Sequence, residues 1–270
     1  NIPIVTTLHG TDITLVGSNK SFFPVAEFSI NESDGVTTVS NQLKKQTEET
    51  FDVKVDIKVI YNFIDFNRFR KTDKDHFKKA IAPDGEKIMV HVSNFRKVKR
   101  IEDVILTFSK ILDEIPAKLL LVGDGPERKK AEQMCRELGT CDHVRFLGKQ
   151  EAIGELLAVA DLFLMPSESE SFGLAALEAL ACEVPVISSN AGGLPELNIN
   201  GVTGFTSDVG DVDSMTKNAL LLLQNPEKLA EFRENAKKQA KRFDLQAVMP
   251  LYEKFYEDVI EKSKAELAVL

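Results

Sequence analysis

The sequence predicts an α/β fold built on parallel sheets, and two observations support that prediction. From Lys87 onward, short apolar or β-branched runs alternate with helical stretches of about 10 to 15 residues, which is typical of βαβ units and parallel strands. The 270 residues are enough for one large or two medium domains. The apolar share of 43% and the charged share of 28% are ordinary for a globular protein.

The first part of the chain shows the same alternation over fewer elements. Strands are expected at 2–8, 35–40 and 55–61, and helices over a segment that ends at about Ser33 and at 41–51. Ser40 or Asn41 can cap the second helix, because their side chains accept from free backbone N–H groups. Residues 65–84 are polar and lack a strand pattern, which indicates a linker between two domains. The chain opens directly on a strand, so we expect a segment upstream of it.

The remaining elements alternate regularly. Strands are expected at 88–92, 118–122, 144–147, 162–165, 184–188 and 204–206, and helices at 101–115, 127–138, 151–160 and 173–181. A last helix carries apolar residues from Val248 to Ile260 at alternating spacings of three and one, which places them on one face. That face can pack on its own domain or on the N-terminal segment. We expect the N-terminal segment 1–61, with the charged residues 237–244 as the crossover.

Composition and charge exclude several classes of protein. The apolar runs are too short to span a membrane, and the net charge of −8 argues against nucleic acid as a partner. Cys135, Cys141 and Cys182 are odd in number and not spaced C-x-x-C, so a disulfide framework or a zinc site is not expected. Reduced cysteines and the lack of a secretory signal predict a cytoplasmic protein. A homo-oligomer is compatible with the sequence.

Two glutamates eight positions apart are the strongest candidates for ligand binding. They lie in P-S-E-S-E-S-F-G-L-A-A-L-E, just after the strand at 162–165, and ligands of open parallel sheets bind beyond the carboxyl ends of the strands. Glu178 sits on a helix of Leu and Ala, where a buried carboxylate needs polar partners such as two ribose hydroxyls. Gly173 allows a phosphate to approach a helix N-terminus. The alternative is that Glu178 is a salt-bridged structural residue and Glu170 a surface charge.

A basic run follows the strand at 88–92. Four cations fall within five residues of Ser93-Asn94-Phe95-Arg96-Lys97-Val98-Lys99-Arg100. A diphosphate needs such charge, and arginine can bind it through two hydrogen bonds. The position at the carboxyl edge of the sheet favours Arg96 and Lys99 for this role. The alternative, a solvated basic loop, is the usual fate of a short charge run and fits Lys97 and Arg100 better.

Three weaker features complete the candidates. Gly123-Asp124-Gly125-Pro126 lacks the third glycine of a dinucleotide fingerprint, because Arg128 stands there. Ala191-Gly192-Gly193-Leu194-Pro195-Glu196 is equally compatible with a plain strand-to-helix turn. His9 follows the first strand, and a lone histidine there is more often structural than catalytic. The four histidines form no catalytic triad, metal pair or Cys-His dyad that the spacing could support.

Taken together, these runs resemble the signature of the glycogen-synthase-like retaining glycosyltransferases of the GT-B fold. The likeness covers nearly the whole chain through P-S-E-S-E-S-F-G-L-A-A-L-E-A-L-A, V-P-V-I, A-G-G-L-P-E, G-D-G-P and F-L-G-K. It implies two Rossmann-like parallel-sheet domains, of which the N-terminal one is incomplete in this chain. On this basis residues 1–65 belong to the acceptor-side domain, 66–243 form the UDP-sugar (donor) domain, and 244–270 form a helix that returns to the N-terminal domain.

Three further runs, H-G-T-D-I-T-L-V-G, Y-N-F-I-D and S-N-F-R-K-V-K-R, are similar to one branch of that family. Members of this branch transfer N-acetylglucosamine from UDP-GlcNAc to L-malate in bacillithiol biosynthesis. The resemblance implies that Glu178 binds the ribose of UDP and Glu170 a hydroxyl of the donor sugar. Arg96 and Lys99 would neutralise the departing diphosphate, so that no metal or other cofactor is needed.

The resemblance also implies roles for residues that the pattern alone does not select. His9 would face the transferred sugar from the acceptor domain. The backbone near Lys149 and Gln150 would contact uracil, and the amides around Phe172, Gly173 and Leu174 the phosphates. The remaining implied substrate contacts are Gly10, Thr11, Ser93, Asn94 and Gly123.

The chain departs from the family at two places, and alternatives remain open. Glu183 replaces the usual glycine of A-x-G-x-P-V, and Asn62-Phe63-Ile64-Asp65 replaces N-G-x-D. Both lie outside the implied phosphate contacts. The alternatives are a UDP-sugar-binding fragment without transferase activity, and a nucleotide-sugar epimerase or phosphorylase of the same fold. A Rossmann oxidoreductase is disfavoured by the incomplete glycine fingerprint.

Overall fold

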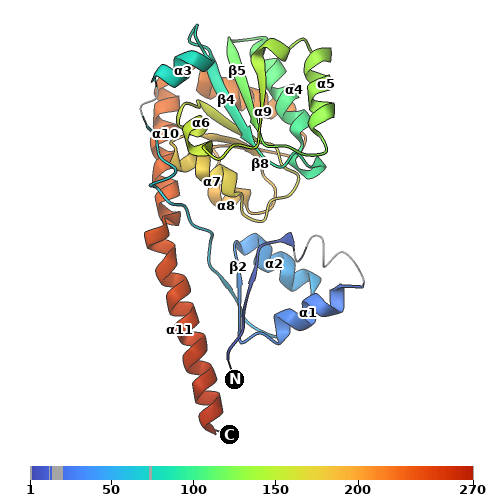
Figure 1. The fold of residues 1–270 in the computed structure, drawn as a ribbon, viewed down its shortest axis with the longest axis vertical. Helices are drawn as coiled ribbons and strands as arrows, with labels where there is room; N and C mark the ends of the chain where they lie inside the picture. The colour runs from blue at the N-terminus through green and yellow to red at the C-terminus, as the bar shows by residue number, and fades with distance from the viewer. Residues whose placement is uncertain (1, 12, 14–20, 73–74, 270) are drawn as a thin grey trace. The chain divides into compact units, whose positions relative to one another are not determined.

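The structure is a computed structural model that describes residues 2–11, 13, 21–72 and 75–269. The chain divides into two compact units. The first unit contains Asn1–Phe63, Glu170–Phe172 and Phe243–Leu270, and the second contains Ile64–Ser169 and Gly173–Arg242. Each unit has a parallel sheet flanked by helices, so the predicted α/β fold class is confirmed (Figure 1).

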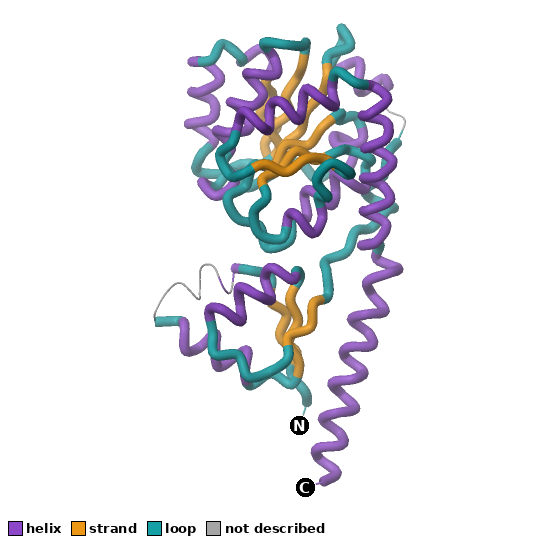
Figure 2. Tube along the Cα trace, turned by 180° about the vertical axis from the view of Figure 1, so that it is seen from behind, coloured by secondary structure: helices purple, strands orange, loops and turns teal. Residues whose placement is uncertain are grey.

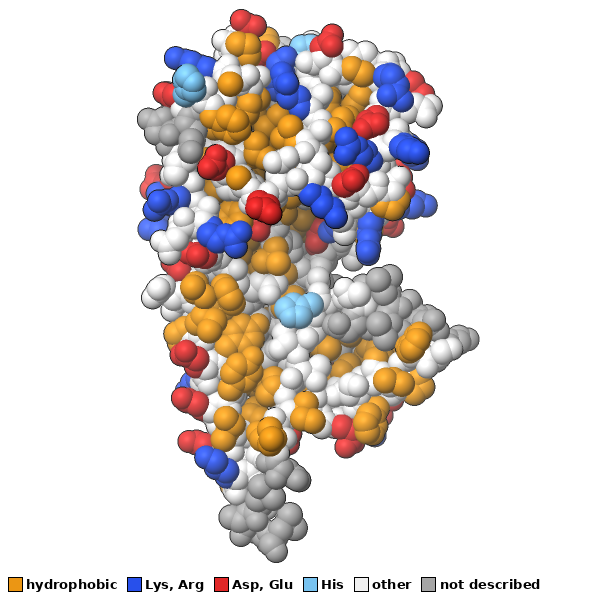
Figure 3. All heavy atoms as spheres, viewed as in Figure 1, with side chains coloured by type: hydrophobic (Ala, Val, Ile, Leu, Met, Phe, Trp, Pro, Cys, Tyr) orange, Lys and Arg blue, Asp and Glu red, His pale blue; other side chains and the backbone are white. Residues whose placement is uncertain are grey.

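The first unit is built on a three-stranded sheet in the order β1-β2-β3. Its strands are β1 (Val5–Leu8), β2 (Gly35–Thr38) and β3 (Ile57–Val59), and its shorter helices are α1 (Phe23–Asn31) and α2 (Asn41–Thr50). The hydroxyl of Ser40 accepts from the backbone N–H of Leu43 at 3.0 Å, so the predicted cap of α2 is confirmed. Exposed apolar side chains of this unit include Ile4, Phe22, Val25 and Phe28, and Figure 3 shows hydrophobic side chains gathered over it.

The long helix α11 (Leu245–Val269) packs on this sheet. Gly35 permits a close approach, because a Cβ there would lie 2.8 Å from Val259 and 2.9 Å from Phe255. The Tyr252 hydroxyl donates to the carbonyl of Ile60 at 3.3 Å. Tyr252, Phe255 and Val259 of α11 therefore lie on the strands of the first unit, as predicted for this helix. Leu251, Tyr256 and Ile260 of the predicted apolar face are instead exposed.

The second unit is built on a six-stranded parallel sheet in the order β6-β5-β4-β7-β8-β9. Its strands are β4 (Lys87–Val92), β5 (Ala117–Val122), β6 (Val144–Gly148), β7 (Leu162–Met165), β8 (Val186–Ser189) and β9 (Gly204–Ser207). Successive strands extend outward from β4 on one side and from β7 on the other. The strand order therefore reverses between β4 and β7, and open α/β sheets bind their ligands in the crevice at such a point.

Helices cover both faces of this sheet (Figure 2). They are α3 (Asp75–Ile81), α4 (Ile101–Leu112), α5 (Arg128–Glu137), α6 (Ile153–Ala158), α7 (Leu174–Ala181), α8 (Leu194–Leu197), α9 (Val212–Leu223) and α10 (Pro226–Ala240). Met89, Leu119 and Leu164 of the strands pack in one core with Ile105 and Phe108 of α4. Among the described helices, none is both long and apolar enough to cross a membrane.

Two segments that the sequence suggests are connections contain regular structure. The expected linker at 65–84 includes α3, of which only Ile81 is buried, so no apolar period marks this helix in the sequence. The expected crossover at 237–244 is the end of α10 followed by a 3₁₀ turn at Lys241–Phe243. Both segments are rich in polar and charged residues because these parts of α3 and α10 lie largely at the surface.

Candidate functional site

The basic run and the glutamate-containing run meet at the switch point of the second sheet. Pairing between β4 and β7 extends to Val90 opposite Phe163, and the loops that follow the two strands continue beyond it. The backbone N–H of Glu168, after β7, donates to the carbonyl of Val98, after β4, at 2.8 Å. Two segments separated by about seventy positions in the chain thus become neighbours at the edge where ligands bind.

Within the basic run, the structure gives Arg100 a structural role. Arg100 has a left-handed φ of 49°, and its Nε donates to Asp103 at 2.5 Å, which raises the pKa of Arg100. Arg96 is exposed and Lys99 half-buried, at the two ends of a tight turn in which the Lys99 N–H donates to the Arg96 carbonyl at 2.8 Å. The Arg100 guanidinium is thus paired within its own helix, and a role of Arg96 and Lys99 in ligand binding stays a prediction.

The two glycines after β5 allow a close approach of loops. A Cβ on Gly123 (φ 122°) would lie 1.8 Å from the carbonyl oxygen of Ser93, and one on Gly125 would lie 2.0 Å from that of Asn94. The Gly123 N–H also donates to the carbonyl of Gly148, at the end of β6, at 2.8 Å. These glycines thus join the ends of β4, β5 and β6, which explains G-D-G-P without a dinucleotide role.

Lys149 and Gln150, implied as uracil contacts, directly follow β6 at the same edge. Both are exposed, and the Gln150 side chain donates to the carbonyl of Leu147 at 2.6 Å. On the loop after β4, Asn94 is also exposed and Ser93 is half-buried. The candidate residues on the loops after β4, β5 and β6 therefore belong to one edge of the second unit.

The N-terminus of α7 lies in the second unit as well. Gly173 precedes the helix with φ 100°, and a Cβ there would lie 2.7 Å from the side chain of Leu194. Leu174, the first residue of α7, is 48% exposed. The first turn of a helix presents N–H groups without helical partners, which suits an anion.

Glu178 projects from α7 as a half-buried carboxylate. Among the described residues no group lies within hydrogen-bond or salt-bridge distance of it. Burial raises the pKa of Glu178 to about 7, and the positive charge of Arg68 offsets part of that rise. The alternative, that Glu178 is a salt-bridged structural residue, is therefore not supported, because no cation of the described residues pairs with it. The carboxylate is able to accept hydrogen bonds from a ligand.

The other candidates belong to the first unit. His9, Gly10 and Thr11 follow β1, and Glu170 and Phe172 lie in the short segment Glu170–Phe172. A Cβ on Gly10 (φ 106°) would lie 2.6 Å from Ser171 Cβ. The run H-G-T-D-I-T-L-V-G continues through Asp12 and 14–17, which lie outside the described residues.

The segment Glu170–Phe172 is held by contacts within the first unit. The Ser40 hydroxyl donates to the carbonyl of Ser171 at 2.6 Å. The buried ring of Phe172 lies 6.0 Å from that of Tyr61 and 5.7 Å from that of Phe243, between ring centroids. Ser40 therefore both caps α2 and fixes the glutamate-containing loop.

Sequence reasoning missed two residues of this site. Arg68, whose charge acts on Glu178, is remote from it in the chain, and no local pattern connects them. His91 lies within the apolar strand β4, immediately before the basic run. A polar residue inside a buried strand was the available signal for His91.

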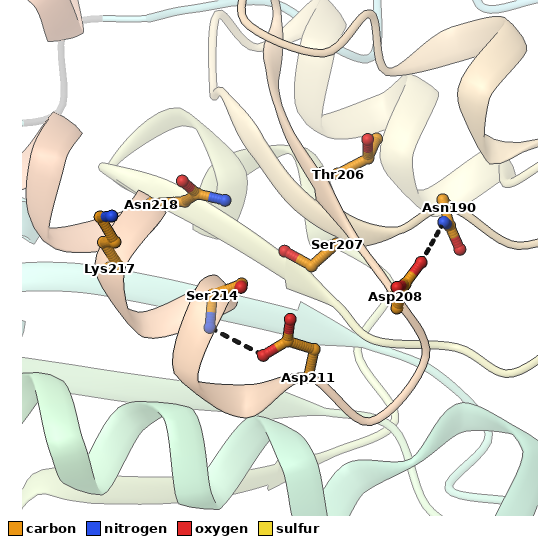
Figure 4. Close-up of a pocket in the computed structure, with 8 residues that line it drawn as sticks. All are labelled: Asn190, Thr206, Ser207, Asp208, Asp211, Ser214, Lys217 and Asn218. Carbon is orange, nitrogen blue, oxygen red and sulfur yellow. Dashed lines mark hydrogen bonds between the residues drawn. The ribbon is translucent and has the colours of Figure 1, made fainter.

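A separate polar hollow of about 370 Å³ lies at the ends of β8 and β9 (Figure 4). Its two carboxylates are engaged in local hydrogen bonds. Asp208 accepts from the Asn190 side chain at 2.7 Å, and Asp211 accepts from the Ser214 N–H at 3.0 Å, which caps α9. The two carboxylates therefore serve to stabilise the loops around the hollow.

In the part of the chain that the structure describes, neither the charged side chains nor the potential metal ligands cluster into a further binding site. Figure 3 shows basic and acidic side chains interspersed over the visible face of the second unit. Within the described ranges, no group of three or more His, Cys, Asp or Glu side chains could hold a metal ion. Cys135 and Cys182 are buried free thiols, and Cys141 is an exposed one.

Comparison with known proteins gives the family. Residues 72–239 match the family described as "Glycosyl transferases group 1", and residues 1–68 match "Glycosyltransferase Family 4". The chain is 45% identical over 265 residues to N-acetyl-alpha-D-glucosaminyl L-malate synthase of Bacillus anthracis, which covers 97% of this chain and 70% of that protein. It is 35% identical over 217 residues to an uncharacterized glycosyltransferase of Methanocaldococcus jannaschii, covering 76% of this chain and 56% of that protein.

Solved structures show the same architecture. Sucrose-phosphate synthase from Thermosynechococcus elongatus aligns with a TM-score of 0.85 at 22% identity, over 97% of this chain and 69% of that one. Anabaena Alr3699/HepE in complex with UDP-glucose aligns with a TM-score of 0.81 at 25% identity, over 97% of this chain and 72% of that one. The chain therefore belongs to the group-1 glycosyltransferases and has a GT-B fold.

Proposed function

We propose that the second unit binds the UDP part of a UDP-sugar at the switch point, and that the whole enzyme transfers N-acetylglucosamine from UDP-GlcNAc to L-malate with retention of the α configuration. The observation that carries this proposal is Glu178, a half-buried carboxylate without a partner among the described residues. The name of the Bacillus anthracis relative and the UDP-glucose in the Anabaena structure support the choice of substrates.

Each part of UDP has a matching group in the second unit. Glu178 accepts from the two ribose hydroxyls, which restores the hydrogen bonds that its carboxylate lacks. The first turn of α7, opened by Gly173, donates to the phosphates. The backbone at Lys149 and Gln150, two exposed residues, contacts uracil.

Arg96 and Lys99 stabilise the leaving group. The bond between the sugar and the diphosphate breaks during transfer, and negative charge accumulates on the departing oxygen. Cations fixed on the loop after β4 interact more strongly with that charge than with the intact donor, so they lower the barrier. This supports transfer without a metal or other cofactor.

The first unit supplies the groups on the sugar and acceptor side. Glu170 holds a hydroxyl of the donor sugar, and His9, with Gly10 and Thr11, faces the transferred sugar. The proposal for malate rests on the relative, because no described residue by itself selects a dicarboxylic acid.

Binding and turnover test this function separately. Calorimetry with UDP in the presence of a chelator should show binding to this chain, whereas loss of all binding under these conditions refutes the metal-free donor site. With the full-length enzyme, UDP-GlcNAc and L-malate, proton NMR should show an α-linked product. Release of UDP at the same rate without malate would favour hydrolysis or epimerisation instead.

A further inference from the structure

His91 lies where β4 and β7 separate. Its side chain is 1% exposed, and the pairing of these strands ends at Val90 opposite Phe163. One residue further along, Nδ1 of His91 lies 2.8 Å from the carbonyl oxygen of Leu164 in β7. Because a carbonyl oxygen only accepts, Nδ1 carries the proton. An imidazole therefore continues the connection between the two central strands at the switch point.

The other ring nitrogen contacts the start of the basic loop. Nε2 lies 2.8 Å from Oγ of Ser93, and with the proton on Nδ1 it accepts from the Ser93 hydroxyl. Ser93 Oγ in turn accepts from the Phe95 N–H at 3.2 Å. Burial, together with the charge of Lys99, lowers the pKa of His91 to about 4, so the ring is neutral at physiological pH and the direction of this chain of hydrogen bonds is fixed.

The start of the loop is held from two sides. Phe95 adopts a φ of 41°, which is costly for a non-glycine residue, and its buried ring stacks on His91 with centroids 6.2 Å apart. On the other side, the Glu127 N–H donates to the Phe95 carbonyl at 3.0 Å, next to the close approach of Gly125. The surrounding contacts therefore impose one backbone conformation on residues 93–95.

We propose that His91 is a positioning residue for the donor diphosphate: acting through Ser93, it fixes the loop that presents Arg96 and Lys99 to the phosphates. This inference rests on the proposed function of the site. A loop held in its binding conformation does not lose conformational freedom when the ligand arrives, so its charges contribute more to affinity. His91 itself does not touch the ligand in this role.

The test compares UDP with uridine, which lacks both phosphates. His91→Phe keeps a ring and removes both hydrogen bonds, whereas Ser93→Ala removes only the connecting hydroxyl. For each variant of this chain we expect the ratio of UDP affinity to uridine affinity to fall about tenfold, the effect of weakening a charged hydrogen bond. Calorimetry for UDP and ligand-observed NMR titration for uridine give the two constants.

Two further variants make the result specific. The double variant His91→Phe/Ser93→Ala should lose no more than either single one, because both act through one connection. Val144→Ala, a buried change at the amino end of β6, should lower the melting temperature and leave the ratio unchanged.

The outcomes separate this inference from the proposed function. An unchanged ratio in both single variants, or an equal loss of UDP and uridine affinity, overturns the positioning role while the UDP site stands. If the wild-type chain binds neither ligand, the proposed function fails and the role of His91 fails with it.

Discussion

At the scale of single residues, Glu178 shows how a proposed binding group can destabilise the protein that carries it. Its pKa of about 7 in the folded chain lies above the ordinary value of 4.5, because burial disfavours the charged form. The folded state therefore holds this proton more tightly than the unfolded state. The contribution of Glu178 to the free energy of unfolding therefore falls as the pH rises from about 4.5 to 7, and above pH 7 it no longer changes.

Replacing Glu178 by Gln should remove that loss. We expect Glu178→Gln to be more stable than the wild type at pH 8, by at most about 3 kcal/mol, and to match it near pH 4. Urea denaturation of both proteins at several pH values measures the difference. A constant difference across this range would show that Glu178 does not titrate as its burial requires.

The same variant should bind UDP poorly at every pH. In the wild type, ribose hydroxyls favour the ionised carboxylate, so binding near pH 6.5 should release a proton and UDP affinity should fall as the pH drops below 7. Calorimetry in buffers of different ionisation enthalpy detects this proton. Glu178→Gln should release none and should lose about 1–3 kcal/mol of binding energy.

At the scale of elements, the loops after β4 and β5 can approach each other closely because Gly123 has no side chain. Gly123→Ala places a methyl group 1.8 Å from the Ser93 carbonyl oxygen and in a conformation that favours glycine, with φ 122°. We expect a loss of more than about 2 kcal/mol of stability, and weaker UDP binding because the basic loop must move.

Gly139→Ala is the matched control for this prediction. Gly139 also has a positive φ, 68°, but a Cβ there would meet no atom within 4 Å. Its substitution should cost only the backbone strain, about 1–2 kcal/mol, and leave UDP affinity unchanged. Equal effects of the two changes on stability and on binding would show that the close approach at Gly123 does not matter.

The connection between α7 and β8 explains one departure from the family pattern. Glu183 stands where the family usually has glycine, and its φ of 61° is a value that glycine adopts without strain. Lys237 of α10 forms an ion pair with the Glu183 carboxylate at 2.7 Å. A contact between elements thus offsets part of the cost of a non-glycine residue at this turn.

At the scale of the whole molecule, the proposed leaving-group cations should act mainly on the chemical step. In the full-length enzyme we expect Arg96→Ala and Lys99→Ala to lower kcat by about 100-fold or more, with a smaller change in KM, because their charge counts most as the diphosphate departs. Steady-state kinetics with UDP-GlcNAc and L-malate measures both constants. A raised KM with unchanged kcat would assign these residues to ground-state binding alone.

The sequence by itself determined the parallel-sheet fold, most strand positions and the two runs that form the candidate site. It could do so because βαβ alternation and residues after strand ends are local patterns. Only the tertiary structure decided that Val98 and Glu168 are hydrogen-bonded neighbours, that Glu178 lacks a partner among the described residues, and that the buried His91 ring is hydrogen-bonded to Ser93. These facts depend on the order of the strands and on burial. Both involve residues that are remote from one another in the chain, so no local sequence pattern reveals them.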